Sequence, residues 1–324
     1  MSYSNFPNGI TSMGIPVLGN GIPITYGKVI FVDADNGADG NDGSTIDQAV
    51  KTIAQAYSMV RTNMDDVIVL STYSVHALSA MLTISKNRVH FVGDMFGRQY
   101  GQRAKVYMGV TTASTDVHAV KNLGVGNTFT GIKFYDDNTL ATYHTSCVGE
   151  GGEYAVYRNC EFYASVNLDS NTFAEVLLNG DSTQFYNCTF GSLADAVSGD
   201  KVRPAVITTV GGVASAVSGG VCRDILFDDC RFWKKAGGTT TAMVKITADY
   251  IERVMEFHNC QFIANPLGSA PATAITSVTL TSGMVLLSGD TAAVKCTALA
   301  TATGIFAALN AKVAATHIAL QSTN

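Results

Sequence analysis

Two carboxylates of this chain have a spacing that could support glycan cleavage. Retaining glycoside hydrolysis uses a pair of carboxyl groups about 5 Å apart. Glu153 and Asp181 each follow a glycine, and 28 residues separate them. That interval equals the period of a repeat described below, so we expect the two side chains on neighbouring coils, about 5 Å apart. The simpler interpretation, which we favour, is that both are solvated turn residues.

The other ionisable residues do not gather into a catalytic constellation. A lyase would need Arg or Lys close to its base, and Arg158, Arg231 and Lys133 stand at outward positions of the repeat without an obvious base beside them. We therefore expect no catalytic residues and a protein that is not an enzyme. The remaining carboxylate candidates are Glu161, Asp228, Asp229 and Glu256.

The sequence also gives little support for a metal ion or a cofactor. The acidic stretch from Asp33 to Asp42 departs from the calcium-loop pattern, because Gly37 stands where the third ligand would fall. We expect a turn there. His258 precedes Cys260 by two residues, but no further ligands follow at zinc spacing. The cofactor expectation is none.

An internal repeat determines the expected fold. The pattern aromatic–x–Asn/Asp–Cys–x–Phe occurs four times, and a weaker copy from Phe129 to Phe134 has Ile132 at the Cys position. Counted from Ile132, successive Cys positions are 28, 28, 42 and 30 residues apart. The four full copies begin at Tyr157, Phe185, Phe227 and Phe257.

The spacing inside each copy predicts a bend. Cys160 and Phe162 lie two residues apart and share one face of a strand. Tyr157 lies three residues before Cys160, so both can face inward only if the chain bends at Asn159, and Asn tolerates the left-handed conformation better than most residues. One bend per repeat predicts an all-β protein, a parallel β-solenoid. Its coils would align a structural ladder of Asn159, Asn187, Asp229 and Asn259, and an interior stack of Ile132, Cys160, Cys188, Cys230 and Cys260.

Three segments are expected along the chain. Residues 1–27 form an extended N-terminal arm rich in Pro and Gly, pinned against a neighbour. Residues 28–262 form the solenoid. A helix near 45–61 is expected to cap its first coil. This helix would begin at Thr45, with Gln48 as the capping-box partner. Residues 263–324 depart from the repeat and are expected to cap the rod or to support oligomerisation. The arm residues expected to anchor the protein are Phe6, Pro7, Ile10, Ile15, Pro16 and Val17.

The amino-acid composition limits the classes of partner that the protein can bind. Lys and Arg number 21 and Asp and Glu 26, a net charge of −5, so no basic excess exists to neutralise nucleic-acid phosphates. Charged residues make up 15% of the chain, below the roughly 25% usual for globular proteins. We expect part of the surface to be covered by another protein or by further copies of the chain. We see no apolar run of membrane-spanning length and no signal-peptide pattern. The seven cysteines form no CxxC pair, which predicts reduced, buried thiols in a protein made in the cytoplasm.

Two sequence features resemble a known group of proteins. The stretch from Phe31 to Gly43, followed by Lys51, Thr52 and Ile53, resembles the entry of pectin-lyase-like right-handed β-helices of bacteriophage structural proteins, and the Asn-Cys-x-Phe coils resemble the same group. The resemblance implies a right-handed single-stranded parallel β-helix. The arm around Phe6 and the segment from Met284 to Asp290 resemble parts of phage virion β-helix proteins without known catalysis.

The sequence therefore favours a non-enzymatic structural protein of a phage virion, assembled in the host cytoplasm and attached to the head through its N-terminal arm as a decoration or fibre-like appendage. The expected partners are other virion proteins, above all the major capsid protein, and copies of itself, as a homotrimer. We expect no nucleic acid and no membrane partner. The alternatives are a tailspike-type receptor-binding protein or polysaccharide depolymerase, for which a glycan would be the partner, and a bacterial surface β-helix.

Overall fold

The structure is a computed structural model of the chain. It describes residues 27–94, 103–108, 118–136, 146–164, 174–191, 205–208, 222–234, 242–246, 251–264, 273–277, 280, 283–294, 296, 298–301 and 305–307, together with the two residue pairs 11–12 and 15–16.

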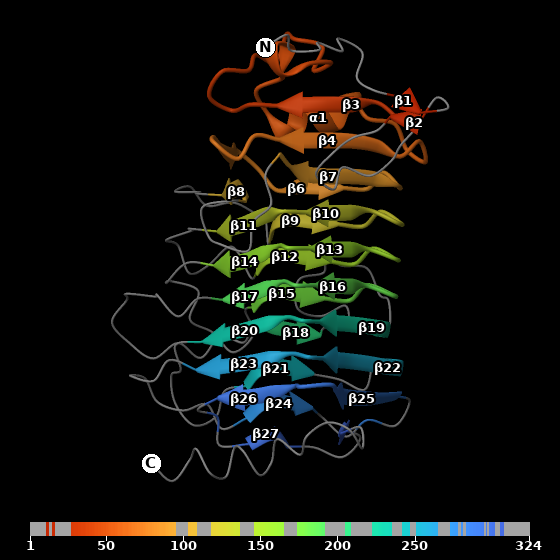
Figure 1. The fold of residues 1–324 in the computed structure, drawn as a ribbon, viewed down its shortest axis with the longest axis vertical. Coiled ribbons are helices and arrows are strands. Elements are labelled where there is room, and N and C mark those ends of the chain that lie inside the picture. Colours follow the sequence, from red (N-terminus) through yellow and green to blue (C-terminus); the bar gives the residue numbers. More distant parts are fainter. Residues whose placement is uncertain are drawn as a thin grey trace.

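The described strands form three parallel sheets that run the length of a rod (Figure 1). Each turn of the chain contributes one strand to each sheet in succession, as in β10, β11 and β12, and the next turn lies directly beside it. The chain is thus an all-β parallel β-solenoid. The right-handed sense of its coil stays a prediction.

The bounds of the strands are as follows. The first sheet holds β3 (Val29–Val32), β4 (Asp66–Leu70), β7 (Val89–Gly93), β10 (Thr128–Thr130), β13 (Val156–Arg158), β16 (Gln184–Tyr186), β19 (Cys222–Asp228), β22 (Ile251–His258), β25 (Gly283–Ser288) and β28 (Ile305–Ala307). The second sheet holds β5 (Val75–Leu78), β8 (Ala104–Met108), β11 (Ile132–Asp136), β14 (Glu161–Ala164), β17 (Thr189–Gly191), β20 (Arg231–Lys234), β23 (Gln261–Ala264) and β26 (Ala292–Val294). The third sheet holds β6 (Leu82–Ile84), β9 (His118–Asn122), β12 (Ser146–Glu150), β15 (Ala174–Leu178), β18 (Val206–Thr208), β21 (Ala242–Ile246), β24 (Thr273–Ser277) and β27 (Ala298–Thr301).

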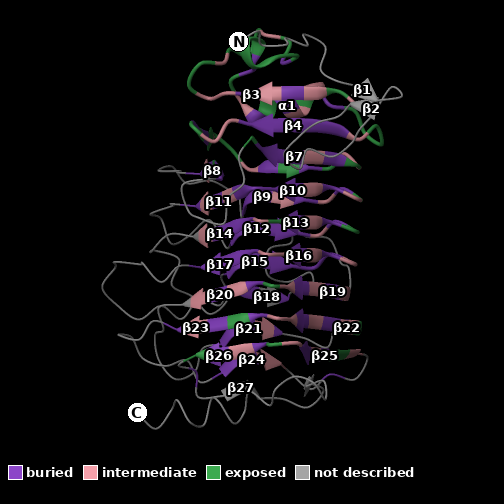
Figure 2. Cartoon of the chain, in the orientation of Figure 1, coloured by how far each residue is buried: buried purple, intermediate pink, exposed green. Residues whose placement is uncertain are grey.

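Two columns of aromatic rings fill the interior, one behind the first sheet and one behind the second. In-register pairing places each ring on the equivalent ring of the next coil, with centroids 4.6 to 5.4 Å apart and nearly parallel planes. The two columns meet edge to face, as at Phe185 and Phe190. Both arrangements suit the ring quadrupole, and Figure 2 shows buried residues in strands all along the rod. The columns are Phe91, Phe129, Tyr157, Phe185, Phe227 and Phe257, and Phe134, Phe162, Phe190, Phe232 and Phe262.

The N-terminal end is built from two short helices rather than the single helix expected over 45–61. The 3₁₀ helix η1 (Ile46–Gln48) follows Thr45, whose side chain makes no capping hydrogen bond, so the expected capping box with Gln48 is wrong. Helix α1 (Ile53–Met59) starts after Thr52, whose hydroxyl accepts the N–H of Gln55. The break is physically reasonable, because Ala49 and Val50 are extended and Val50 pairs with Val32 instead of continuing a helix.

The solenoid extends past the boundary expected at residue 262. Strands β24 to β28 join the same three sheets in parallel register, and Leu287 on β25 pairs with Phe257 on β22. The coil that contains β25 lacks the repeat motif, so the sequence did not predict it. Leu287 replaces the aromatic residue, and Gly289, at a φ of +61°, replaces Asn at the bend. The expected oligomerisation role of residues 263–324 stays a prediction.

Of the N-terminal arm, the structure describes only a short antiparallel pair, β1 (Thr11–Ser12) with β2 (Ile15–Pro16). Phe6, Pro7, Ile10 and Val17 lie outside the described residues. Across the described part of the chain, no helix has the length and apolar character needed to cross a bilayer.

Candidate functional site

The residues of the predicted ladder occupy the bend between the first and second sheets. Asn159, Asn187, Asp229 and Asn259 all have a φ of +52°. Each donates its backbone N–H to a carbonyl of the following coil, as Asn159 does to Tyr186 at 3.0 Å. The Asn187 amide also donates to the side-chain oxygen of Asn159. The structure therefore brings these four residues together as one line along the rod.

The interior stack lies beside this line. Ile132, Cys160, Cys188, Cys230 and Cys260 are all at most 1% exposed. Each thiol lies 3.3 to 3.5 Å from a backbone oxygen of the preceding coil, so its S–H can donate inward, as Cys260 does to Phe227. All seven cysteines of the chain are buried thiols outside any disulfide.

Burial sets the chemistry of these thiols. It raises the pKa of Cys160 and of Cys230 well above the ordinary thiol value, and it raises the pKa of Cys222 to about 12. The thiolate is the nucleophile and the metal ligand in cysteine chemistry. These three side chains therefore stay neutral at physiological pH and act as small apolar groups with a weak donor.

The carboxylate pair singled out from the sequence does lie on adjacent coils. Glu153 and Asp181 form a parallel bridge between two turns on the outside of the rod. Asp181 is engaged, since one of its carboxylate oxygens lies 3.2 Å from the Arg223 guanidinium, which also pairs with Glu252. Of the other candidates, Asp228 and Asp229 lie at the bend, where the Asp228 carbonyl accepts the N–H of Asn187.

Glu161 is at the centre of a buried ion cluster on the outer side of the second sheet. Its side chain is 1% exposed, and its two oxygens lie 3.0 Å from the Arg103 guanidinium and 3.0 Å from Lys133 Nζ. Arg103 also donates from Nε to the carbonyl of Asn159 at 2.7 Å. Two cations thus satisfy one buried carboxylate, as a buried charge requires.

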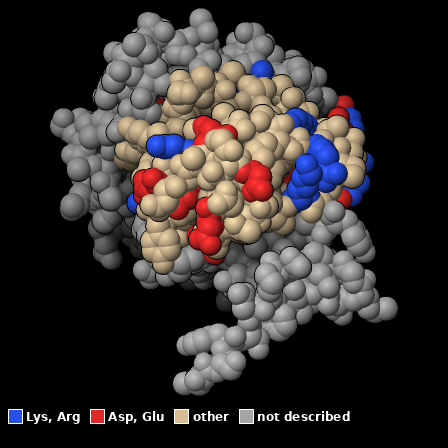
Figure 3. Space-filling model, turned by 90° about the horizontal axis from the view of Figure 1, so that it is seen from above, with Lys and Arg blue, Asp and Glu red and all other residues tan. Residues whose placement is uncertain are grey.

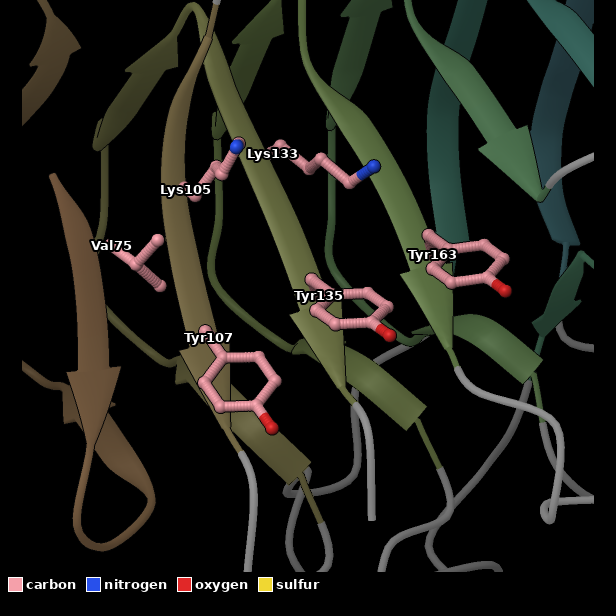
Figure 4. A pocket seen from close by; sticks show the side chains of 6 residues that line it. All are labelled: Val75, Lys105, Tyr107, Lys133, Tyr135 and Tyr163. Carbon is pink, nitrogen blue, oxygen red and sulfur yellow. The ribbon is translucent and has the colours of Figure 1, made fainter. Parts of the chain in front are cut away.

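This cluster borders a groove, which we call the Lys–Tyr groove, on the outer face of strands β5, β8, β11 and β14. It encloses about 490 Å³ and is lined by Val75, Lys105, Tyr107, Lys133, Tyr135 and Tyr163 (Figure 4). Lys105 pairs in register with Lys133, and Tyr107 with Tyr135 and then Tyr163. The alternation of the strand puts both rows on the same outer face, two residues apart.

The tyrosine row is preorganised. The rings of Tyr107 and Tyr135 stack with centroids 5.4 Å apart, and those of Tyr135 and Tyr163 stack at 5.1 Å with planes 7° apart. Lys133 Nζ lies 5.7 Å from the Tyr135 centroid and 5.5 Å from that of Tyr163. In Figure 4 the three hydroxyls point the same way while the lysines occupy the other end of the groove. The arrangement can bind an extended anion with regularly placed oxygens.

Sequence reasoning missed this groove, although its signal was present. Lys105 and Lys133 are 28 residues apart, as are Tyr107, Tyr135 and Tyr163 in turn. The repeat motif consists of inward positions, whereas these residues face outward between them.

Two further clusters combine a hydroxyl, a histidine and a carboxylate. His90 Nδ1 lies 2.8 Å from Thr128 Oγ1, and its Nε2 lies 3.3 Å from Asp65, which also pairs with Arg88. Burial lowers the pKa of His90, which keeps the ring neutral near pH 7. The backbone around Thr128 is committed to the ladder of β10 between β7 and β13, so it offers no pair of donors for an oxyanion.

The second cluster has the wrong order for a nucleophile relay. Ser288 Oγ donates to Glu256 at 2.5 Å and lies 2.8 Å from His258 Nδ1. In a relay the base stands between the hydroxyl and the acid, whereas here the hydroxyl stands between the other two groups. Glu256 thus serves to hold β22 and β25 together.

In the loop from Asp33 to Ser44 at the N-terminal end, carboxylates accept backbone N–H groups of the loop and of the residues before α1. Asp33 accepts the N–H groups of Asp35 and Asn36, and Asp39 accepts those of Lys51 and Thr52 at 3.0 and 2.8 Å. Figure 3 shows acidic side chains spread over this end of the rod and the larger group of basic ones at one side of it. The Asp33 bonds are those of an Asx turn and fit the turn interpretation of this loop, whereas the Asp39 bonds tie the loop to the residues before α1.

Comparison with known proteins agrees with this architecture. No family model and no curated protein matches the sequence. Among solved structures, a pectate lyase superposes with a TM-score of 0.55 at 12% identity, covering 88% of this chain and 80% of that one. A pectin methylesterase in complex with a hexasaccharide gives 0.56 at 12% identity over 88% and 89%, and a pectin methylesterase from Erwinia chrysanthemi gives 0.54 at 12% over 88% and 89%. At this identity the likeness concerns the fold alone, and the chain has the parallel β-helix fold of pectin-lyase-like proteins.

Proposed function

We propose that this chain is a non-enzymatic structural protein of a bacteriophage virion, carried on the head as a decoration or fibre-like appendage. The observation that supports this role best is the uninterrupted interior of the rod. Stacked rings continue from Phe91 to Phe257 in one column and from Phe134 to Phe262 in the other. An appendage needs a body of this kind, because it has to hold its far end at a fixed distance from the particle.

The coils reinforce one another mechanically. Each inner coil is hydrogen-bonded to the coil on either side, so no coil can open without disrupting two interfaces. At the bend, for example, Thr189 donates to the Cys160 carbonyl and Arg231 to the Cys188 carbonyl, each at 2.9 Å. The rod therefore behaves as a stiff unit.

Attachment is assigned to the N-terminal arm and self-association to the C-terminal residues. The arm is apolar and rich in Pro and Gly, and its sequence resembles the arms of phage virion β-helix proteins. In this proposal it lies along the major capsid protein, and the mature appendage is a homotrimer.

The experiment that tests this role is immunogold labelling of the source particles with antibody to the chain, combined with particle binding by a variant that lacks residues 1–27. Dense label over the head and loss of binding by the truncated variant are the expected results. Label at the tail tip would overturn the head assignment, and label on no particle would overturn the virion role. Unchanged binding by the truncated variant would overturn attachment through the arm.

A tailspike-type polysaccharide depolymerase is the second candidate, favoured by one observation. Glu153 and Asp181 pair in parallel register on adjacent coils. The ion pair from Asp181 to Arg223 gives that carboxylate a structural partner as well. Glycan release that disappears in both Glu153→Ala and Asp181→Ala would establish the enzyme, and release that is absent in the native protein on the host's own glycans would remove it.

A further inference from the structure

We propose that the N-terminal arm, which precedes Gly27, docks on its own rod, across the outer side of strands β3, β4 and β7. The contact goes beyond the proposed attachment to a particle, because it concerns the free protein. An arm held in this way is withheld from any partner until that partner displaces it.

The first coils carry apolar side chains on both sides of the first sheet, and β4 is buried along its whole length (Figure 2). Its residues Ile68 and Leu70 belong to the interior cluster. Val67 and Val69 point the opposite way, as the alternation of a strand requires, and form a second cluster with residues of β3 and β7. We call this cluster the outer apolar face, and its members are Val29, Phe31, Val67, Val69 and Val92.

The outer apolar face is covered by the chain itself. Val67 and Val92 are fully buried and Val69 is 3% exposed, although only one chain is present. Apart from β1 and β2, every described strand belongs to one of the three sheets of the solenoid, and none of them can cover the outer side of its own sheet. Helix α1 packs its buried residues into the interior cluster instead. Another segment of the same chain therefore lies over these valines.

The apolar character is confined to the coils nearest the arm. In-register pairing places Thr130 beside Val92, and Arg158 beside Thr130. Arg158 is exposed, so the outer side of the first sheet has become polar by β13. In Figure 1, β1 and β2, the described part of the arm, lie at the level of β3 and β4 along the rod. The arm is thus at the right level to cover this face.

The last residues of the arm have the pattern of an extended segment with one apolar side. Ile22, Ile24 and Tyr26 alternate with Pro23 and Thr25. Five extended residues span about 17 Å, whereas the three strands of the face span two strand spacings, about 10 Å. Proline has no N–H to donate, which suits a segment that crosses a sheet better than one that joins its ladder.

The arm enters the rod at the edge of the outer apolar face. Gly27 lies against the turn before β4, where a Cβ would stand 2.4 Å from the Asp65 carbonyl oxygen. The N–H of Lys28 donates to the Asp66 carboxylate at 2.7 Å. These contacts fix the start of the arm beside Val29 and Val67, which pair in register.

Another stretch near the face, residues 95–102, begins at the opposite end of the same strands. There the N–H of Asp94 donates to the Leu70 carbonyl at 2.9 Å. Val67, which is fully buried, lies at the end where the arm enters. The burial of Val67 therefore favours the arm as the segment that covers the face.

The test uses introduced thiols, because the seven native thiols are all buried. Val69→Cys places a thiol on the outer apolar face, and Arg158→Cys places one at an exposed outward position of the same sheet. Iodoacetamide is a small neutral reagent for both. In the full chain it should alkylate Val69→Cys about tenfold more slowly than Arg158→Cys, because the covered thiol reacts only when the arm lifts.

Ile22→Asp combined with Ile24→Asp places two charges on the apolar side of the arm and should raise the rate at Val69→Cys to that at Arg158→Cys. The matched control, Pro23→Asp combined with Thr25→Asp, places two charges on the opposite side and should leave the protection intact. Unfolding temperatures should confirm that all variants are folded.

Rapid alkylation of Val69→Cys in the full chain would overturn the proposal, and so would protection that survives the double substitution of Ile22 and Ile24, since another segment would then cover the face. Protection that disappears on dilution would assign the contact to the arm of a second copy and would overturn docking on the same rod. None of these outcomes depends on where the protein sits on a particle, so the structural role is tested separately.

Discussion

Inside the solenoid, the hydroxyl of Tyr157 donates a hydrogen bond to the carboxylate of Glu150. The same carboxylate accepts the side-chain amide of Asn122 at 3.0 Å and the N–H of Gly152 at 2.7 Å. Glu150 is fully buried, and its neighbours in register are Asn122 on one coil and Leu178 on the next. A carboxylic acid thus lies in a largely apolar interior.

This placement predicts that the protein is less stable at neutral than at mildly acid pH. Burial raises the pKa of Glu150 from its ordinary 4.5 to about 7. Below pH 4.5 the group is protonated in both the folded and unfolded chain, and its contribution to stability is complete. As pH rises through 7, the folded protein must ionise a buried group, which costs on the order of 3 kcal/mol.

Glu150→Gln checks this, because glutamine keeps the shape and resembles the protonated acid. The difference in unfolding free energy between the variant and the native protein should grow in the variant's favour from pH 4.5 to 7.5, measured by urea denaturation. Arg253→Gln, at an exposed surface ion pair, serves as a control. A difference that does not change over that range would contradict the assignment.

The ring column predicts a large loss for Phe227→Ala. Phe227 is fully buried, with Phe185 stacked on one side at 4.8 Å and Phe257 on the other at 4.7 Å. Removing a buried aromatic side chain from a core typically costs about 3 to 5 kcal/mol. Phe227→Leu should lose clearly less, because it retains most of the volume. Denaturant unfolding of the two variants provides the measurement, and equal losses would show that the volume retained by leucine does not matter at this position.

Much of the fold was predictable because its signal is local. The three-residue step from Tyr157 to Cys160, with Asn159 between them, already requires a bend between two inward-facing residues. Each copy of the motif carries that requirement, and the structure meets it with the same positive φ each time.

The features that could not be predicted occur in single coils or at outward positions, where the repeat gives no signal. Glu150 has no counterpart in the coils beside it, so no periodicity marks it as an inward-facing acid. The last coils were not recognised because they lack the motif. Leu287 fills the aromatic position, and Thr291, whose hydroxyl accepts the backbone N–H of Cys260, stands at the Cys position. The Lys–Tyr groove was not predicted because outward residues carry no hydrophobic pattern. Only the coil period of 28 residues relates Tyr107 to Tyr135.

The buried thiols predict an all-or-none reactivity. The cysteines are buried throughout the rod, and burial holds the pKa of Cys230 well above its ordinary value. A thiol reagent such as Ellman's reagent should therefore react with almost none of the seven in the native state and with all seven in guanidinium. Labelling should follow the rate of global unfolding, because an inner coil cannot open alone. Rapid labelling of one or two native thiols would show that those coils open independently.

The bend predicts an unusual order of substitutions at position 187. Asn187 has a φ of +52°, and its amide donates to Asn159 on the preceding coil. Asn187→Gly loses only the amide bond, since glycine adopts this conformation without steric cost. Asn187→Ala loses the amide bond and also places a Cβ in the left-handed region, at a further cost of roughly 1 to 2 kcal/mol. Glycine should therefore be the milder change, the reverse of the order in an ordinary strand, and thermal denaturation of the two variants measures it. If alanine proved as stable as glycine, the bend would be able to leave the left-handed region, and the ladder would not hold the coils in register.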